Sequence, residues 1–436
     1  MTTIDTVVIG AGHAGLAVSK LLTDAGREHV VLDRGRIGHR WRTERWDSLH
    51  LLTPSWMTRL PGWSYRGPHP DGYLSVGSFI GYLESYAASF GAPVVDGATV
   101  HEVAAEPGGR PARRYRVVTS RGTWHARHVV IATGPHGTPH VPAGLAGLDT
   151  SRVDLVTSNS YRSPGRLRAG GVLVVGASAS GTQIADELNR AGREVTLAVG
   201  RHTRMPRRHR GLDIFWWLEN TGRLARTIDE MADPVAARGE TSLQLVGRDD
   251  PERATEDLDL GRLQEHGVRL VGRLETVDGR TARFRDDLAA TVSAADATLE
   301  QLLESLDHFV ERIGLAGQLW DSPRPRPVAI GTARRRIDLR ADGIGTVLVA
   351  SGYRPHHPWL RLPITDPGGT IRQYRGVTPA EGVYVVGQRF QHRRDSGQID
   401  GARHDARSVV AHLLAASGSP ASATIGSGAG RQEPAA

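Results

Sequence analysis

The chain has 436 residues, of which 39% are hydrophobic and 23% charged, so it is long enough for two or three globular domains. Its net charge of +7 comes almost entirely from arginine, because Lys20 is the only lysine. These arginines are spread along the sequence, whereas a nucleic-acid-binding protein more often mixes both residue types on one face or tail. The absence of cysteine excludes disulfide frameworks, thiolate metal sites and thiol nucleophiles, and no metal site is expected.

The two ends of the chain carry signals for location and order. The N-terminus, "MTTIDTVVIGAG", enters a strand pattern within four residues, which leaves no room for a signal peptide. No later apolar run reaches membrane-spanning length, so we expect a cytoplasmic, soluble protein with no membrane partner. Residues 415–436 are small, polar and aperiodic, and are predicted to be a disordered tail.

The first nucleotide motif lies in "TVVIGAGHAGLAVSKLL", where a buried-strand pattern is followed by a glycine turn and then by helical spacing. Gly10 permits the turn, Gly12 lets a pyrophosphate approach the backbone, and Gly15 lets the helix pack on the strand. The next strand, "HVVLD", ends at Asp33, at the distance where a carboxylate accepts hydrogen bonds from an adenosine ribose. We therefore predict an FAD site here.

The same unit recurs in "GVLVVGASASGTQIADELNRAGREVTLAV", with Gly176, Ser178 and Gly181 at the three glycine positions. The tetrapeptide "AGRE" stands at 25–28 and again at 191–194, in the same register to each motif. In that register Val199 replaces Asp33, so the second copy lacks the ribose carboxylate.

The second copy runs instead into a basic stretch, "GRHTRMPRRHRG". A guanidinium can donate two parallel hydrogen bonds to the 2′-phosphate of NADPH, whereas a carboxylate would repel this phosphate. We therefore expect NADPH at this site, with Arg201 as the main reader of the phosphate and Arg204 or His202 assisting. Arg207, Arg208 and Arg210 either lie on a solvated surface or bind a ligand, and the sequence favours neither alternative.

The remaining strand patterns predict a split first domain. Strands are expected at 128–134, 346–355 and 382–388, followed by a helix near 403–414. The predicted fold is an α/β fold of two Rossmann-like dinucleotide-binding domains, the NADPH domain being inserted into the FAD domain. We expect the FAD-binding domain to comprise residues 1–164 and 336–414. The NADPH-binding domain, which includes a helical insertion, is expected at residues 165–335.

Over almost its whole length the sequence resembles the flavin-containing monooxygenases, closest to a bacterial branch and to the plant YUCCA enzymes. The segments that carry this resemblance, besides the two motifs, are "GHRWRTERWDSLHLLTP", "MPRRHRGLDIFWWL", "ASGYRPHHPWL" and "DSGQIDGARHDA". The resemblance implies that Trp41 lies near the flavin, and that "ATG" and "ASG" mark the two crossovers between the domains. Gly387, at the end of the last strand, is expected to bind the cofactor as well.

The resemblance also implies a reaction: NADPH reduces FAD, O2 adds to flavin C4a, and the peroxide oxygenates a small-molecule substrate at nitrogen, sulfur or a carbonyl. Leu52 stands where some members carry an asparagine beside the flavin, which favours a specialised biosynthetic substrate. No acid–base pair is visible from spacing, so catalytic residues stay unassigned. His392, Arg393 and Arg394 are candidates for binding an acidic substrate, with an ordinary surface loop as the alternative.

Two other functions stay open at this point. An NADPH oxidase or flavin dehydrogenase would use the same two cofactors without oxygen transfer, and a basic flavoprotein that binds nucleic acid is a more remote option. Reductases that need a cysteine pair are excluded. Oligomeric state is also open, with a homodimer as one option, and no nucleic-acid partner is expected.

Overall fold

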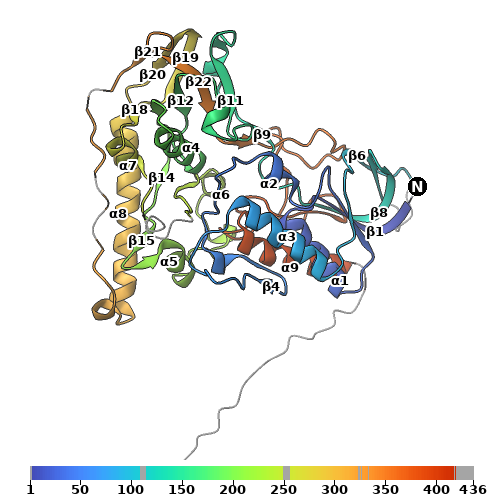
Figure 1. The fold of residues 1–436 in the computed structure, drawn as a ribbon. Helices are drawn as coiled ribbons and strands as arrows, with labels where there is room; N and C mark the ends of the chain where they lie inside the picture. The colour runs from blue at the N-terminus through green and yellow to red at the C-terminus, as the bar shows by residue number, and fades with distance from the viewer. Residues whose placement is uncertain are drawn as a thin grey trace, which may run out of the picture.

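The computed structural model of the protein describes residues 2–108, 114–248, 256–322, 325, 327–331, 333–416 and 418. Within them the chain forms two lobes, each built on a largely parallel sheet (Figure 1). The predicted α/β class with two dinucleotide-binding units is confirmed. Of the tail predicted to be disordered, residues 415 and 416 end the last helix, whereas 417 and 419–436 lie outside the described residues.

The first lobe has a sheet whose parallel strands are buried on both faces, as their continuous apolar runs predict. Strand β8 (Gly122–Ile131) pairs with three other strands of this sheet. It pairs with β1 along its length, with the antiparallel strand β7 at its start and with β24 at its end. The other strands of this sheet are β5 (Val94–Val95), β2 (His29–Leu32), β1 (Thr2–Ile9), β7 (Tyr115–Thr119), β6 (Val100–Ala105) and β24 (Val383–Val385).

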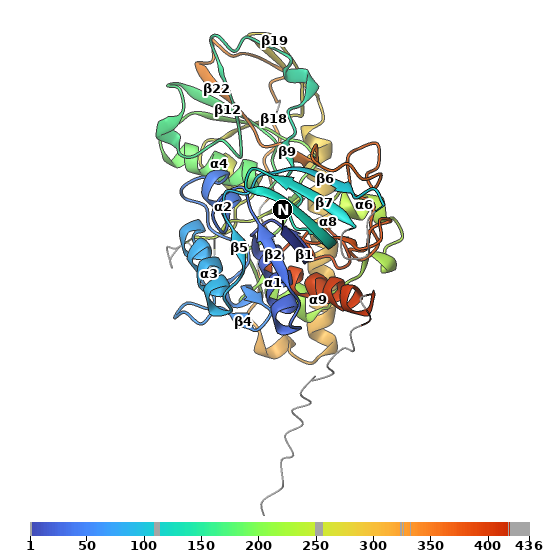
Figure 2. The same ribbon diagram turned by 90° about the vertical axis from the view of Figure 1, so that its right-hand side faces the viewer.

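Three helices cover one face of this sheet: α1 (His13–Asp24), α3 (Val76–Ser89) and α9 (Ile399–Ala416). Figure 2 shows them gathered on one side of the strands. Helix α9 therefore returns the end of the chain to the first nucleotide unit, as the predicted helix near 403–414 required. Its spacing of small and apolar residues, such as Ala402, Ala406 and Val409, lets it pack closely on α1.

The second lobe repeats this plan with a five-stranded parallel sheet in the order β11–β22–β12–β13–β18. Helices α4 (Ala179–Arg190) and α7 (Leu260–Glu265) pack on one face, and a smaller four-stranded sheet packs on the other. The strands of the two sheets are β11 (Asp154–Thr157), β22 (Ile344–Val349), β12 (Gly171–Val175), β13 (Val195–Ala198) and β18 (Arg269–Val271), then β10 (Gly147–Leu148), β19 (Leu274–Gly279), β20 (Thr281–Phe284) and β21 (Arg336–Asp338).

The strands next to the predicted boundaries 164/165 and 335/336 pair within the second sheet. Strand β11 precedes residue 165 and β22 follows residue 335, yet both belong to the second sheet, where β22 lies between β11 and β12. The physical reason is that apolar runs such as 346–349 suit either parallel sheet, and only hydrogen-bond pairing decides between them. The crossovers lie at the two expected tripeptides: β9 (Thr138–Pro139) follows "ATG", β23 (Tyr353–Arg354) follows "ASG", and these two strands pair antiparallel.

Two segments complete the second lobe, one between β13 and α7 and one between β20 and β21. We call them together the insertion. The 25-residue helix α8 (Leu288–Arg312) packs one apolar face, including Leu299, Leu303 and Leu306, over α5 (Ile214–Asn220). Trp217 of α5 is fully buried and donates its indole N–H to the His209 carbonyl at 2.8 Å. The short elements around them are α6 (Pro234–Arg238), β14 (Thr203–Arg204), β15 (Arg208–His209), β16 (Leu212–Asp213) and β17 (Leu243–Gln244).

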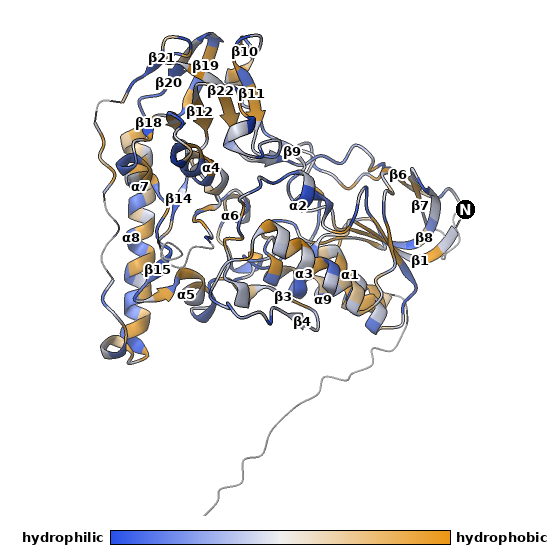
Figure 3. Ribbon diagram, viewed as in Figure 1, coloured by the Kyte–Doolittle hydropathy of each residue, from blue (hydrophilic) through white to orange (hydrophobic). Residues whose placement is uncertain are grey.

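Hydrophobic residues concentrate in the strands of both sheets, whereas α8 alternates between hydrophobic and hydrophilic positions (Figure 3). No helix in the described part of the chain combines the length and the hydrophobicity that crossing a bilayer requires.

The buried Asp405 in α9 predicts how stability depends on pH. Its side chain is fully buried, and burial raises the pKa of Asp405 to about 7. A carboxyl in an unfolded chain titrates near pH 4, so between about pH 4 and pH 7 the folded state holds the extra proton and stability falls as pH rises. We expect Asp405→Asn to stabilise the protein more at pH 8 than at pH 5, and so to raise Tm more at pH 8. The gain in unfolding free energy should differ by about 2 kcal/mol between the two pH values. Thermal unfolding followed by circular dichroism checks this, and an equal effect at both pH values would contradict it.

Candidate functional site

The first glycine turn lies between β1 and α1 and has the geometry that a bound nucleotide needs. Gly10 has φ +111°, and a Cβ there would lie 2.6 Å from the Ala132 carbonyl oxygen. A Cβ on Gly15 would lie 1.9 Å from the Gly10 oxygen, so α1 rests directly on the turn. A Cβ on Gly12 would meet nothing within 4 Å. Gly10 and Gly15 are thus required by packing, and Gly12 faces open space.

Asp33 follows β2 at the edge of this turn. Its carboxylate accepts the backbone N–H of Ala11 at 2.7 Å and that of Gly35 at 3.1 Å. Burial raises the pKa of Asp33, and these two backbone hydrogen bonds counteract that shift. The carboxylate is thereby fixed against the glycine turn, where its remaining lone pairs can accept ribose hydroxyls.

The second glycine turn, between β12 and α4, repeats the first closely. Gly176 also has φ +111°, with a hypothetical Cβ 2.6 Å from the Ala350 oxygen, and a Cβ on Gly181 would lie 1.8 Å from the Gly176 oxygen. Ser178 takes the place of Gly12 with φ −86° and ψ −173°, against −85° and −178° for Gly12. Extended backbone of this kind accepts any residue, which explains why serine fits here.

The two arginines predicted to read a 2′-phosphate have different surroundings. Arg201 is exposed, and its Nη2 donates to the Gly239 carbonyl at 2.7 Å. Arg204 is buried and paired with Asp259 at 2.5 Å and Asp296 at 2.7 Å. Its guanidinium is thus neutralised within the protein, which favours a structural role for Arg204 and leaves Arg201 as the accessible candidate.

The other basic residues of this stretch are also largely neutralised. Arg207 is fully buried, pairs with Asp213 at 2.8 Å and donates to the Leu52 carbonyl at 2.9 Å. His202 is buried too, and desolvation lowers its pKa. Arg210 pairs with Asp307 at 2.7 Å, whereas Arg208 is exposed. The density of arginine here therefore mostly serves ion pairs inside the insertion.

Trp41 and Gly387 approach the first glycine turn from two sides. The N–H of Gly38 donates to the Ala11 carbonyl at 3.0 Å. Gly38 directly precedes α2 (His39–Thr43), the short helix that contains Trp41. The Trp41 ring meets Phe79 edge to face at 4.8 Å. Gly387 has φ +74°, and a Cβ there would lie 2.9 Å from the Ala14 Cβ. Gly387 thus lies against the start of α1, and Trp41 lies in the short helix that the Gly38–Ala11 hydrogen bond joins to the glycine turn.

The segment after Trp41 joins the two lobes, a role that the sequence pattern alone did not reveal. Trp46 and Leu49 pack into the core of the second lobe, whereas Leu51 belongs to the core of the first. Ser48 donates to Glu187 of α4 at 2.9 Å. The signal that could have indicated this role is the alternation of buried apolar and polar residues in "RWDSLHLL".

The loop that carries His392, Arg393 and Arg394 is a joint between the lobes. Arg393 pairs with Asp395 through two contacts of 3.0 Å, and Arg394 pairs with Glu240. The His392 carbonyl accepts the N–H of Ile228 at 2.7 Å. Both guanidinium groups have carboxylate partners, which favours a structural role over recognition of an acidic substrate.

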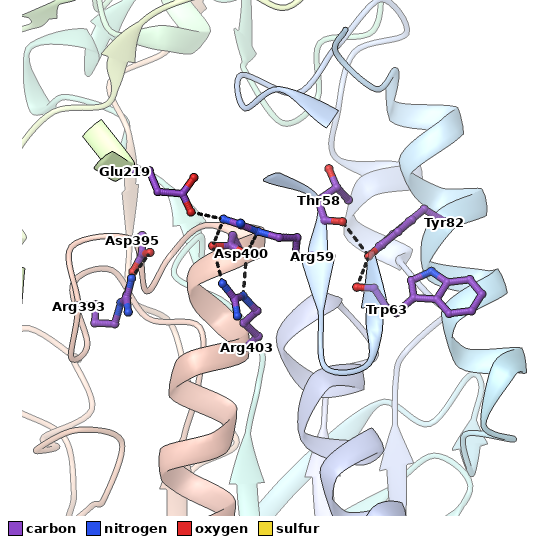
Figure 4. A network of polar contacts seen from close by, with 9 residues as sticks. All are labelled: Thr58, Arg59, Trp63, Tyr82, Glu219, Arg393, Asp395, Asp400 and Arg403. Carbon is purple, nitrogen blue, oxygen red and sulfur yellow. Dashed lines mark hydrogen bonds and ion pairs between the residues drawn. The ribbon is translucent and has the colours of Figure 1, made fainter. Parts of the chain in front are cut away.

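A second network links the lobes at Arg59, at the start of β3 (Arg59–Leu60), whose hairpin partner is β4 (Trp63–Ser64). Its guanidinium contacts Asp400 of α9 at 2.7 and 2.9 Å and Glu219 of α5 at 2.6 Å (Figure 4). Arg403 adds a 2.7 Å contact to the same Asp400. Arg375 likewise meets Asp229 at 2.7 Å.

These pairs share one pattern of charge. Arg59, Arg375 and Arg394 of the first lobe meet the acids Glu219, Asp229 and Glu240 of the insertion. We call these three pairs the clamp. The clamp thus connects the insertion with the first lobe at three places.

Comparisons with known proteins agree with this geometry. Residues 7–229 match the pyridine nucleotide-disulphide oxidoreductase family. A CzcO-like oxidoreductase of Geobacillus kaustophilus is 29% identical over 422 residues, covering 94% of this chain and 98% of that protein. The indole-3-pyruvate monooxygenase YUCCA4 of Oryza sativa is 28% identical over 389 residues, 76% of this chain and 83% of the enzyme.

A solved structure with the same fold is the flavin-containing monooxygenase from Stenotrophomonas maltophilia, with a TM-score of 0.64 at 20% identity, covering 95% of this chain and 99% of that one. The resemblance to flavin monooxygenases seen in the sequence is confirmed. The open space at Gly12 leaves room for a pyrophosphate, and the second turn repeats the backbone of the first, which fits the FAD and NADPH that this family uses. The chain belongs to the pyridine nucleotide-disulphide oxidoreductase family, as a flavin-dependent oxidoreductase with flavin monooxygenases among its relatives.

Proposed function

We propose that the protein is an NADPH-consuming, FAD-dependent monooxygenase that places one atom of O2 on a nitrogen, sulfur or carbonyl carbon of a small molecule. The single observation that carries this proposal is the pair of matching glycine turns, of which the first ends beside a carboxylate and the second beside an accessible arginine. Bound FAD supplies the acceptance of hydride from NADPH and the reaction with O2.

The residues of the chain have separate tasks in this proposal. The free amides at the start of α1 hold the FAD pyrophosphate, with Gly12 giving it access and Asp33 accepting the ribose hydroxyls. The start of α4, with Gly176, Ser178 and Gly181, does the same for NADPH, and Arg201 binds its 2′-phosphate. Trp41 and Gly387 position the flavin end of FAD.

Oxygen transfer is preferred to other uses of the two cofactors for two reasons. The sequence holds no cysteine, so a dithiol cannot receive electrons from the flavin. Relatives that align over most of the chain include a plant enzyme named for monooxygenation of indole-3-pyruvate.

The FAD site predicts that Gly12→Val abolishes binding of FAD. A valine side chain would occupy the open space that the pyrophosphate enters, while the turn itself need not change. Absorbance of the purified protein measures the bound flavin. The matched control is Gly81→Val, because Gly81 in α3 also faces open space but lies away from the turn. Stoichiometric FAD in Gly12→Val would show that the first site is misassigned.

The NADPH site predicts that Arg201→Ala weakens NADPH binding by the worth of a charge-assisted hydrogen bond, on the order of 1.5–3 kcal/mol. Binding of NADH should be nearly unchanged, because NADH has no 2′-phosphate. Anaerobic reduction of the flavin at varied cofactor concentrations gives both affinities. Arg208→Ala, at an exposed arginine of the same stretch, should leave both unchanged. Equal losses for both cofactors in Arg201→Ala would remove its role in selectivity.

The reaction type predicts incorporation of one labelled oxygen atom when candidate amines, thioethers and ketones are incubated with the enzyme, NADPH and ¹⁸O2. Mass spectrometry of the products, with parallel assays of NADPH consumption and hydrogen peroxide, provides the measurement. If all consumed NADPH appears as hydrogen peroxide and no product carries label, an NADPH oxidase replaces the monooxygenase.

A further inference from the structure

We infer that the imidazole of His13 binds the pyrophosphate of FAD. His13 is the first residue of α1 and follows Gly12 directly. The glycine pattern requires no histidine at this position, and the ring makes no contribution to the turn geometry described above. The inference rests on the proposed FAD site, to which it adds a side-chain ligand.

The main observation is that the ring has unused hydrogen-bonding capacity. Both ring nitrogens of His13 are buried, and neither has a hydrogen-bond partner among the described residues. His29, a buried residue, contrasts with it: its ring nitrogens contact the Ser19 hydroxyl at 2.7 Å and the Arg27 carbonyl at 3.0 Å, whereas His13 is half-buried with only its nitrogens fully covered. A buried polar group without a partner is costly and rare, so its persistence calls for a ligand.

The position of the ring identifies the kind of ligand. The amides at the start of α1 point out of the helix and favour an anion there. His13 belongs to this first turn, and Gly12 next to it faces open space. Burial lowers the pKa of His13 to about 4, so near neutral pH the ring is uncharged and donates through one N–H.

The charges around the ring also favour an anion. His136 lies close to His13, and the charged groups that face His136 are Arg40, Arg45 and Arg389. Arg45 donates to the Glu44 carbonyl at 2.7 Å and covers the Trp41 ring at 5.2 Å, and no carboxylate partner is found for it within the described residues. Arg40 is paired with Glu44 at 2.8 Å, so Arg45 is the cation whose charge a pyrophosphate would best complement.

Three variants of the full-length chain test this inference: His13→Leu, His13→Gln and, as the matched control, His29→Leu. FAD is titrated into each protein after removal of flavin, with the change in FAD fluorescence as the readout, and Tm is measured without FAD. We expect His13→Leu to weaken FAD binding about 10-fold to 100-fold. The amide of His13→Gln can still donate, so its affinity should stay within about 3-fold of the original.

The stability readout separates binding from structure. If the ring has no partner in the protein, His13→Leu should raise Tm without FAD by about 2 °C or more, because leucine removes a buried polar group. His29→Leu should lower Tm and leave FAD affinity unchanged, since it breaks two internal contacts. A trade of affinity for stability is thus the signature of a ligand-binding histidine.

Three results would overturn the inference. FAD affinity unchanged in His13→Leu would exclude contact with the pyrophosphate, and a change confined to NADPH affinity would move the ring to the other cofactor. A lower Tm without FAD, or failure of His13→Leu to fold, would make His13 a structural residue. If Gly12→Val loses FAD while His13→Leu binds it normally, only the inference about His13 fails and the proposed function stands.

Discussion

Both lobes depend on one close backbone contact, which occurs once in each glycine turn. The third glycine, Gly15 or Gly181, lies against the carbonyl oxygen of the first, Gly10 or Gly176. With no Cβ on Gly15 or Gly181, each helix begins almost on top of the carbonyl group that ends the preceding strand. This closeness directs the start of the helix, with its free amides, out of the carboxyl edge of a parallel sheet, where ligands bind in folds of this type. The two turns share this geometry although only two of their three glycines are common.

Arginine has three different uses in this chain, and burial distinguishes them. Arg204 and Arg207 are buried against carboxylates and act as internal ties of the insertion. The arginines of the clamp are partly exposed and connect the lobes. Arg201 is exposed and bound to a carbonyl group, so its charge is available to a ligand. Of the arginines among the described residues, only Arg204 and Arg207 are buried, and the ion pairs of the other arginines are partly exposed and distributed over both lobes.

Much of the fold could be predicted from the sequence, because glycine spacing and apolar runs are local signals. Both units and the repeat register follow from residues that stand close together, whereas the two crossover tripeptides followed from the family resemblance. The membership of β22 could not be predicted, since its apolar run fits either sheet and its partners β11 and β12 are distant in the chain. The same limit applies to Arg204 and Arg394, whose carboxylate partners lie 55 and 154 residues away.

The pairing of β9 with β23 has a mechanical consequence. The chain passes between the lobes twice, and at both passages it forms one antiparallel ribbon, so the tethers are bonded to each other. Two bonded tethers resist separation and bending of the lobes far more than a single strand does, and leave twisting about the ribbon as the soft coordinate. The clamp adds three further contacts between the lobes, made by other segments of the chain. A large rotation of one lobe against the other must therefore both twist the ribbon and break the ion pairs of the clamp.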